Sequence, residues 1–394
     1  MRGGTCHLIS SGASRLIKGL FAFGVGFQLI LLSEVALLCF GCSSSASNDR
    51  WRTSGPEAQS GARVEYWPTE AWRPSTPERE GMDPALLRKA HIHIEKELAN
   101  FRSLLVIRNG YIVYEAYYHG LTEDALQPTR SVTKSFLSAL VAIAIEKKHL
   151  QGPDQKLSDI FPEHFTKESD PLKKEITLRH LLTMTSGLFS AETERNWGSN
   201  SGRSWVESIL NRPMAGKPGE QFYYGVYSWP AHLLSAGITK KTGMSAREFA
   251  DRHLFGPLGI GQVEWATDPE GFSIGPYGLN LTSRDMAKFG YLFLKKGRWE
   301  GKQIIPPNWV EEATRKHNDG GLPERAGYGY LWWVSEETGH PAYFAAGYGG
   351  QFIYVIPALD LVVVTTGESR IGPSQLTDHR HVIREFIAPA VKGR

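Results

Sequence analysis

The sequence predicts an α/β protein of the α+β kind, in which one antiparallel sheet is built from both chain ends and is flanked by helices. Two β-rich runs meet at Asn109-Gly110, early in the folded part, and more β-rich runs fill the last third of the chain. Segments with helical spacing occupy the middle. We therefore expect a mainly helical region inserted at about 150–270, with a cleft where it meets the sheet.

The first 42 residues are predicted to be a signal peptide or a lipoprotein signal. Basic residues up to Lys18 precede an apolar stretch at 19–42, and a Ser-rich segment follows. The run FGCSSS favours lipidation at Cys42, while a cleaved secretory signal and an uncleaved anchor remain alternatives, because the span is about long enough to cross a bilayer. Each alternative predicts export to the cell envelope, with membrane attachment through the anchor or the lipid. Residues 43–71 are expected to be a flexible tether, and residues 72–394 the folded domain.

Composition and charge exclude several classes of protein. A formal charge of +3 with no basic cluster gives no indication of nucleic-acid binding. The three cysteines are Cys6, Cys39 and Cys42, so the folded domain has neither a disulfide framework nor a cysteine nucleophile. His91 and His93 are two apart in a helical stretch and would point away from each other, and no HExxH, CxxC or P-loop motif occurs. We expect no metal and no cofactor.

The elements of the first half follow from local signals. Pro84 to Ala99 has helical spacing of apolar residues, with Asp83 as the expected cap. The segment 103–118 reads as a hairpin around an Asn-Gly turn. A strongly apolar helix is expected over 131–147. Further helices are predicted at 176–188, 229–242 and 245–255.

The second half turns from helix to strand. A capped amphipathic helix is expected over 281–297. Strands are predicted at 328–334, 342–349, 351–357 and 359–367, and a final helix at 374–390.

The start of the apolar helix carries the first chemical signal. Ser131 and Lys134 are three residues apart, so in a helix they share a face. A serine hydroxyl is a weak nucleophile, but a lysine amine whose pKa is lowered by burial can take its proton. The Ser131 N–H would point toward an anion formed there. The alternative is structural: Ser131 caps the helix and Lys134 extends toward solvent.

The interpretation of Ser131 and Lys134 also depends on the sequence around them. The stretches RSVTKSFLSALVAIAIE, ITLRHLLTMTSGL, KPGEQFYYG, HLLSAGITKKTGMSAREFADRHLFGPLGI, GLNLTSRDMAKFGYLFLKKG and GYGGQFIYVIP occur in this order. Together they resemble the serine β-lactamase-like hydrolases, in the branch of class C-type enzymes, esterases and 6-aminohexanoate-dimer hydrolase. The resemblance implies a β-lactamase/transpeptidase-like fold over about 72–391. It places the nucleophile on Ser131 and its lysine on Lys134.

The resemblance also implies a tyrosine in the proton relay. In PGEQFYYGVYSWPAHLL, counting from the Pro-Gly pair indicates Tyr224, whereas counting back from the next helix falls between Tyr224 and Tyr227. Tyr224 is favoured and Tyr227 kept as the alternative. Aromatic packing is the structural interpretation of both. No Asn follows either tyrosine, which departs from the family pattern.

The third family motif falls on AAGYGG. Ala345 stands where the family carries a cation, while Gly347 is kept. By position, the Tyr348 N–H would be the second oxyanion donor, and Gly347, Gly349 and Gly350 would let the backbone approach a ligand. A bulged strand near a turn is the structural alternative for these glycines.

We therefore predict a serine hydrolase that cleaves a small ester or amide through an acyl-enzyme, with penicillins disfavoured because Ala345 removes the contact to their carboxylate. A catalytically silent member that binds cell-wall peptides or a protein partner is one alternative. A peptidoglycan DD-peptidase with the same nucleophile is another.

Overall fold

The structure is a computed structural model that describes residues 66–189, 204–225 and 228–392. The predicted N-terminal signal, Cys42 and most of the tether lie outside the described residues, as does Tyr227. Within the described part, none of the helices combines the length and the apolar character needed to cross a bilayer.

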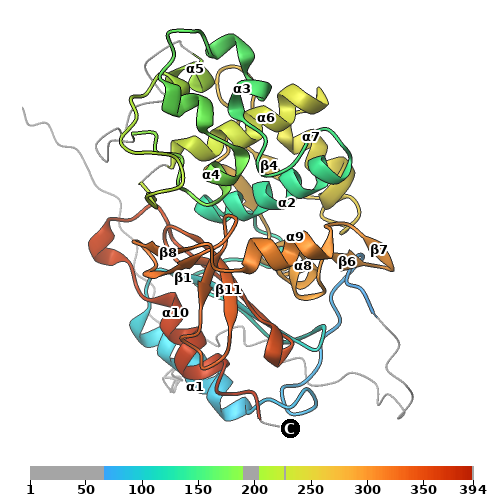
Figure 1. The fold of residues 1–394 in the computed structure, drawn as a ribbon. Coiled ribbons are helices and arrows are strands. Elements are labelled where there is room, and N and C mark those ends of the chain that lie inside the picture. The colour runs from blue at the N-terminus through green and yellow to red at the C-terminus, as the bar shows by residue number, and fades with distance from the viewer. Residues whose placement is uncertain (1–65, 190–203, 226–227, 393–394) are drawn as a thin grey trace, which may run out of the picture. The chain divides into compact units, whose positions relative to one another are not determined.

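The main sheet of the described chain is antiparallel throughout and joins the two ends of the folded region (Figure 1). In spatial order its strands are β2 (Tyr111–Tyr117), β1 (Phe101–Arg108), β13 (Leu361–Gly367), β12 (Gln351–Ile356), β11 (Ala342–Gly347), β10 (Trp333–Ser335), β9 (Ala326–Tyr328) and β8 (Asn318–Gly321). Leu105 of β1 lies opposite Val364 of β13, so an early strand and a late strand are neighbours inside the sheet. The predicted fold class is confirmed.

Helices pack against this sheet through small residues and aromatic rings. In α8 (Ser283–Leu294), a Cβ on Gly290 would lie 2.7 Å from Ile353 and Val362, so the helix backbone lies almost on the sheet. α1 (Pro84–Glu97) begins as predicted, with Asp83 accepting the Ala85 N–H at 2.8 Å.

A helical region lies between the two halves of the sheet in sequence and is grouped at one end of the fold in Figure 1. Its central helix is α2 (Thr133–Glu146), which is buried from its first residue to Ala144 because every face meets protein. The others are α3 (Leu157–Ile160), α4 (Leu178–Leu182), α5 (Trp205–Leu210), α6 (His232–Thr242) and α7 (Ala246–Ala250). A small sheet of β3 (Gln127–Pro128), β5 (Leu279–Leu281) and β4 (Glu264–Trp265) is joined to the chain just before α2, because the Thr129 N–H bonds to the Leu279 carbonyl at 2.9 Å.

Three sequence predictions were wrong in detail. The helix predicted at 176–188 is only α4, Leu178–Leu182, and the chain leaves the helical conformation at Met184, which has φ +57°. The run 328–334 is not one strand: a turn separates β9 from β10, with the Gly329 N–H bonded to the Trp332 carbonyl at 2.8 Å and Leu331 at φ +61°. The final helix does not start at 374; helical turns at Pro373–Gln375 are followed by extended chain, and α10 (His379–Val382) then continues as a wider helix to Ile387. Elements that were not predicted include β6 (Arg298–Trp299), β7 (Lys302–Gln303) and α9 (Pro307–Thr314), as well as the edge strand β8.

Candidate active site

Ser131 lies on a tight 3₁₀ turn, Arg130–Val132, directly before α2. The turn is anchored from behind, because Thr129 donates both its N–H and its hydroxyl to the Leu279 carbonyl, at 2.9 and 2.8 Å. Arg130 has φ +52°, an uncommon conformation for a residue with a side chain. No side chain caps α2, so Ser131 is not the helix cap that the structural alternative required.

Lys134 is turned toward Ser131 rather than toward solvent. Its Nζ lies 2.7 Å from the Ser131 Oγ and 3.0 Å from the Pro276 carbonyl oxygen, and the residue is only 2% exposed. No described carboxylate forms an ion pair with it. Burial without a counter-charge lowers the pKa of Lys134 from 10.5 to about 7. A neutral amine is therefore well populated at neutral pH, next to a hydroxyl.

Tyr224 completes a cluster of three side chains. The Lys134 Nζ lies 4.8 Å from the centre of its ring. Burial raises the pKa of the Tyr224 phenol, and a hydrogen bond with Ser131 partly opposes that rise. The ring also packs on Trp333, with ring centres 5.2 Å apart. Tyr224 is thus beside both Ser131 and Lys134, whereas the alternative Tyr227 is outside the described residues.

The end of β11 passes close to the turn that carries Ser131. A Cβ on Gly347 would overlap the Thr129 carbonyl and lie 3.1 Å from the Arg130 Cβ, so only glycine allows this approach. The next residue is Tyr348. Within the described part of the chain, the N–H groups of Ser131 and Tyr348 have no hydrogen-bond acceptor, which leaves both free to bind an oxyanion.

The following glycines serve a turn. Gly349 and Gly350 have φ values of +89° and +92° where the chain reverses from β11 into β12. Glycine adopts such values without strain. The structural alternative, a turn, therefore describes these two positions. The Tyr348 side chain is 44% exposed and donates its hydroxyl to the Ile371 carbonyl at 3.0 Å.

The position of the family's cation carries no charge. Ala345 is 1% exposed and lies opposite Ile353 in the sheet. Arg130 is adjacent to Ser131, but its Nε donates to the Ser369 hydroxyl at 2.9 Å. Among the described residues, no group of three or more His, Cys, Asp or Glu side chains is placed to hold a metal.

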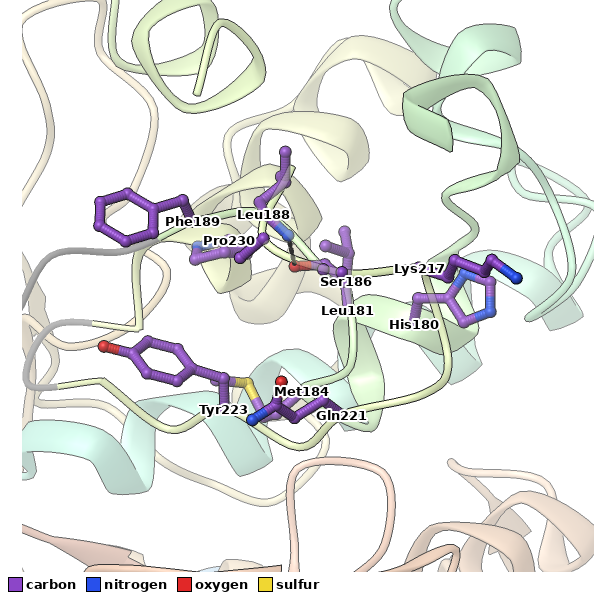
Figure 2. Close-up of a pocket in the computed structure, with 13 residues that line it drawn as sticks. His180, Leu181, Met184, Ser186, Leu188, Phe189, Lys217, Gln221, Tyr223 and Pro230 are labelled. Carbon is purple, nitrogen blue, oxygen red and sulfur yellow. Dashed lines mark hydrogen bonds between the residues drawn. The ribbon is translucent and has the colours of Figure 1, made fainter. Parts of the chain in front are cut away.

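A cavity of about 230 Å³ borders the segment that carries the tyrosine (Figure 2). Leu181, Leu188 and Pro230 supply apolar lining, with His180 and Lys217 at one end and Tyr223 toward the other. The Tyr223 N–H is bonded to the Met184 carbonyl at 2.9 Å, so consecutive tyrosines serve two places: Tyr223 lines the cavity and Tyr224 contacts Lys134.

Sequence reasoning missed Pro276. Pro276 contributes a main-chain carbonyl, which any residue could supply, so no pattern of side chains in the sequence indicates this contact. The only local signal is the Gly275-Pro276 pair, which predicts a turn.

Comparison with known proteins identifies the family. Residues 102–385 match the family model described as beta-lactamase. The chain belongs to the beta-lactamase family. Members of this family are serine hydrolases, and this beta-lactamase-family protein is one of them.

Similar proteins agree in fold across most of the chain. The 6-aminohexanoate-dimer hydrolase of Paenarthrobacter ureafaciens is 23% identical over 309 residues, covering 72% of this chain and 76% of that protein. A penicillin-binding protein homologue from Caulobacter crescentus has a TM-score of 0.64 at 16% identity, covering 80% and 98% of the two chains. EstCE1, a hydrolase with promiscuous acyltransferase activity, has a TM-score of 0.63 at 15% identity, covering 79% and 98%.

Proposed function

We propose that this beta-lactamase-family protein hydrolyses a small ester or amide through an acyl-enzyme on Ser131, with Lys134 as the base. The observation that carries the proposal is the buried Lys134 amine, 2.7 Å from the Ser131 Oγ and without a carboxylate partner among the described residues. A pKa of about 7 supports it, because an ordinary lysine would be almost entirely protonated at that pH.

The chemistry proceeds in two halves. Lys134 takes the Ser131 hydroxyl proton while the Oγ bonds to the substrate carbonyl carbon, and the carbonyl oxygen becomes an oxyanion. As the tetrahedral intermediate collapses, the bond to the leaving group breaks, and the leaving alcohol or amine receives the proton. Water then attacks the acyl-enzyme, gives a proton back through the same groups, and releases the acid and free Ser131.

Three further groups have roles in this scheme. The N–H groups of Ser131 and Tyr348 hold the oxyanion, which is where preorganised donors contribute most to the rate. The Tyr224 phenol, hydrogen-bonded to Ser131, carries the proton between Lys134 and the leaving group. Because its pKa is raised by burial, it acts as a neutral donor rather than as a phenolate.

The proposed substrate class follows from the missing cation at Ala345 and from the name of one relative. Ala345 offers no cation for a substrate carboxylate, so neutral substrates are favoured over penicillins. A relative named 6-aminohexanoate-dimer hydrolase supports short amides as candidates beside esters.

The test is mass spectrometry of the purified protein after reaction with a fluorophosphonate probe. We expect one adduct on Ser131 and none in the Ser131→Ala variant. Wild-type protein that is folded by circular dichroism and stays unlabelled would refute the proposed acylation of Ser131 and favour binding of a peptide or partner at this site. If labelling occurs, release of D-Ala from a D-Ala-D-Ala peptide would identify a DD-peptidase instead of a simple esterase or amidase.

A further inference from the structure

A buried histidine–aspartate pair lies behind the candidate site and has no role in the steps above. His232 is the first residue of α6, and Asp268 lies in the turn that follows β4. Both side chains are fully buried, with Nε2 of His232 3.1 Å from Oδ2 of Asp268. Burying two such polar side chains is costly unless each polar atom has a partner.

The hydrogen-bond pattern fixes one arrangement of the pair. The Gly275 N–H donates to Nδ1 of His232 at 3.2 Å, so this nitrogen is the acceptor and the ring proton is assigned to Nε2, which donates to Asp268. The other carboxylate oxygen of Asp268 accepts the N–H groups of Glu270 and Phe272, at 2.9 and 2.8 Å. Neither the ring nor the carboxylate can turn over without losing a bond.

The His232–Asp268 pair is connected to the Lys134 amine through Gly275 and Pro276. Gly275 precedes Pro276, whose carbonyl accepts a hydrogen bond from Lys134 Nζ at 3.0 Å. A Cβ on Gly275 would lie 2.6 Å from the Ala231 carbonyl oxygen and 2.7 Å from the His232 Cα, so this backbone is packed directly on the start of α6. The proline ring restricts φ at the next residue. A displacement of Gly275 therefore moves the carbonyl that Lys134 contacts.

The Pro276 carbonyl matters because it can orient a neutral Lys134 amine. The amine has two N–H donors and one lone pair. When Pro276 accepts one N–H, rotation about the last side-chain bond is restrained, and the lone pair can be directed at the Ser131 hydroxyl. Orientation of this kind is a large part of what an active site contributes to rate.

We propose that His232, held by Asp268, is a positioning residue that fixes the Gly275-Pro276 segment and thereby orients the Lys134 amine toward Ser131. The inference rests on the proposed function, since it takes Lys134 as the base.

Among the described residues, few titratable groups lie around Lys134 or around the His232–Asp268 pair. Ser131 and Tyr224 face the Lys134 amine. Asp268 faces His232, and the Glu270 carboxylate in the same turn accepts the Trp205 N–H at 3.1 Å.

Asp268→Asn is the sharpest perturbation, because it changes one atom and little volume. One side-chain oxygen must still accept the N–H groups of Glu270 and Phe272, so the new NH₂ group faces His232. The ring proton is then forced onto Nδ1, where it opposes the Gly275 N–H. Two donors face each other, and the segment that carries the Pro276 carbonyl must shift.

The matched control is Ser235→Ala. Ser235 lies on the same helix and donates to the Ser273 carbonyl of the same segment at 2.6 Å, but it is not on the path to Lys134. Two measurements apply to full-length wild type and both variants. One is the limiting rate of fluorophosphonate labelling at high pH, where the amine is neutral. The other is the titration midpoint of Lys134, followed by NMR of its ¹³Cε, which needs no catalysis.

For Asp268→Asn we expect the limiting labelling rate to fall at least tenfold. We also expect the Lys134 midpoint to fall by at least half a pH unit, because a carbonyl acceptor favours the charged amine. Ser235→Ala should stay within twofold in rate and keep the midpoint, even if its melting temperature drops. An unchanged midpoint in folded Asp268→Asn would overturn the proposal, as would an equal loss in Ser235→Ala.

Variants of the histidine give an independent check. Gln can accept from Gly275 and donate to Asp268 across a similar span, whereas Phe keeps the ring volume and does neither. His232→Gln should keep the labelling rate within about threefold of wild type and His232→Phe should lose at least tenfold; equal rates in the two would overturn the proposal. Wild-type protein that never labels would refute the proposed function alone, because the NMR midpoint still tests the coupling to Lys134.

Discussion

Replacing Lys134 by methionine should stabilise the fold at neutral pH while it abolishes acylation. The ordinary lysine pKa is 10.5, and the folded protein lowers it to about 7, which corresponds to about 5 kcal/mol against the charged amine. The residue is 2% exposed, so solvent screens little of this cost. Methionine has similar length and no charge, and it removes the cost.

The pH dependence separates this effect from lost packing or hydrogen bonds. Between pH 7 and 10.5 the unfolded chain holds a proton at Lys134 that the folded protein does not. The free energy of unfolding of the wild type therefore rises with pH through this group, by about 1.4 kcal/mol per pH unit. Below pH 7 both states are protonated, and the contribution is constant.

Urea unfolding of wild type and Lys134→Met at pH 7.5, 8.5 and 9.5 measures this difference. The advantage of the variant should shrink by about 2.5 kcal/mol across the series. Ser131→Ala, which keeps the amine, should follow the wild-type slope. A stability difference that does not change with pH would refute the lowered pKa, and with it the argument that Lys134 is neutral at pH 7.

Further expectations follow from the same geometry. Tyr224→Phe should slow ester hydrolysis by about 100-fold or more, as the loss of an acid–base group does, whereas Tyr227→Phe should not slow it. The reverse result would assign the proton relay to Tyr227 instead of Tyr224. Gly347→Ala should slow labelling at least tenfold and cost about 1–3 kcal/mol in urea unfolding, because its Cβ would overlap the Thr129 carbonyl in the turn that carries Ser131. Cys42→Ser should move the full-length protein from the membrane to the soluble fraction if a lipid anchors it.

Local signals in the sequence predicted the parts of the fold that depend on local physics. The Asn109-Gly110 pair marks the turn between β1 and β2, and the apolar run after Ser131 becomes the buried α2. The three-residue spacing of Ser131 and Lys134 correctly predicted that the two side chains meet. Each of these features is set by residues within one or two turns of chain.

Features set by distant contacts were not predictable in the same way. The strand expected at 328–334 is interrupted because the Leu331 N–H bonds to Leu182 and the Leu331 carbonyl accepts from Ser135, two partners far away in sequence. Pro276 contributes a carbonyl that no side chain reveals. Tyr224 and Tyr227 could not be separated by counting, since loop length is what differs from the family pattern.

The pairing of β1 with β13 has a consequence for the order in which the protein assembles. Leu105 and Val364 are partners across about 260 residues, and closing a loop of that length costs about 5 kcal/mol of chain entropy. Until β13 is available, β1, a buried interior strand of the sheet, has one unpaired edge. On the ribosome, the first hairpin must therefore wait for almost the whole chain. Truncation before residue 361 would expose an apolar edge that invites aggregation rather than give a smaller folded enzyme.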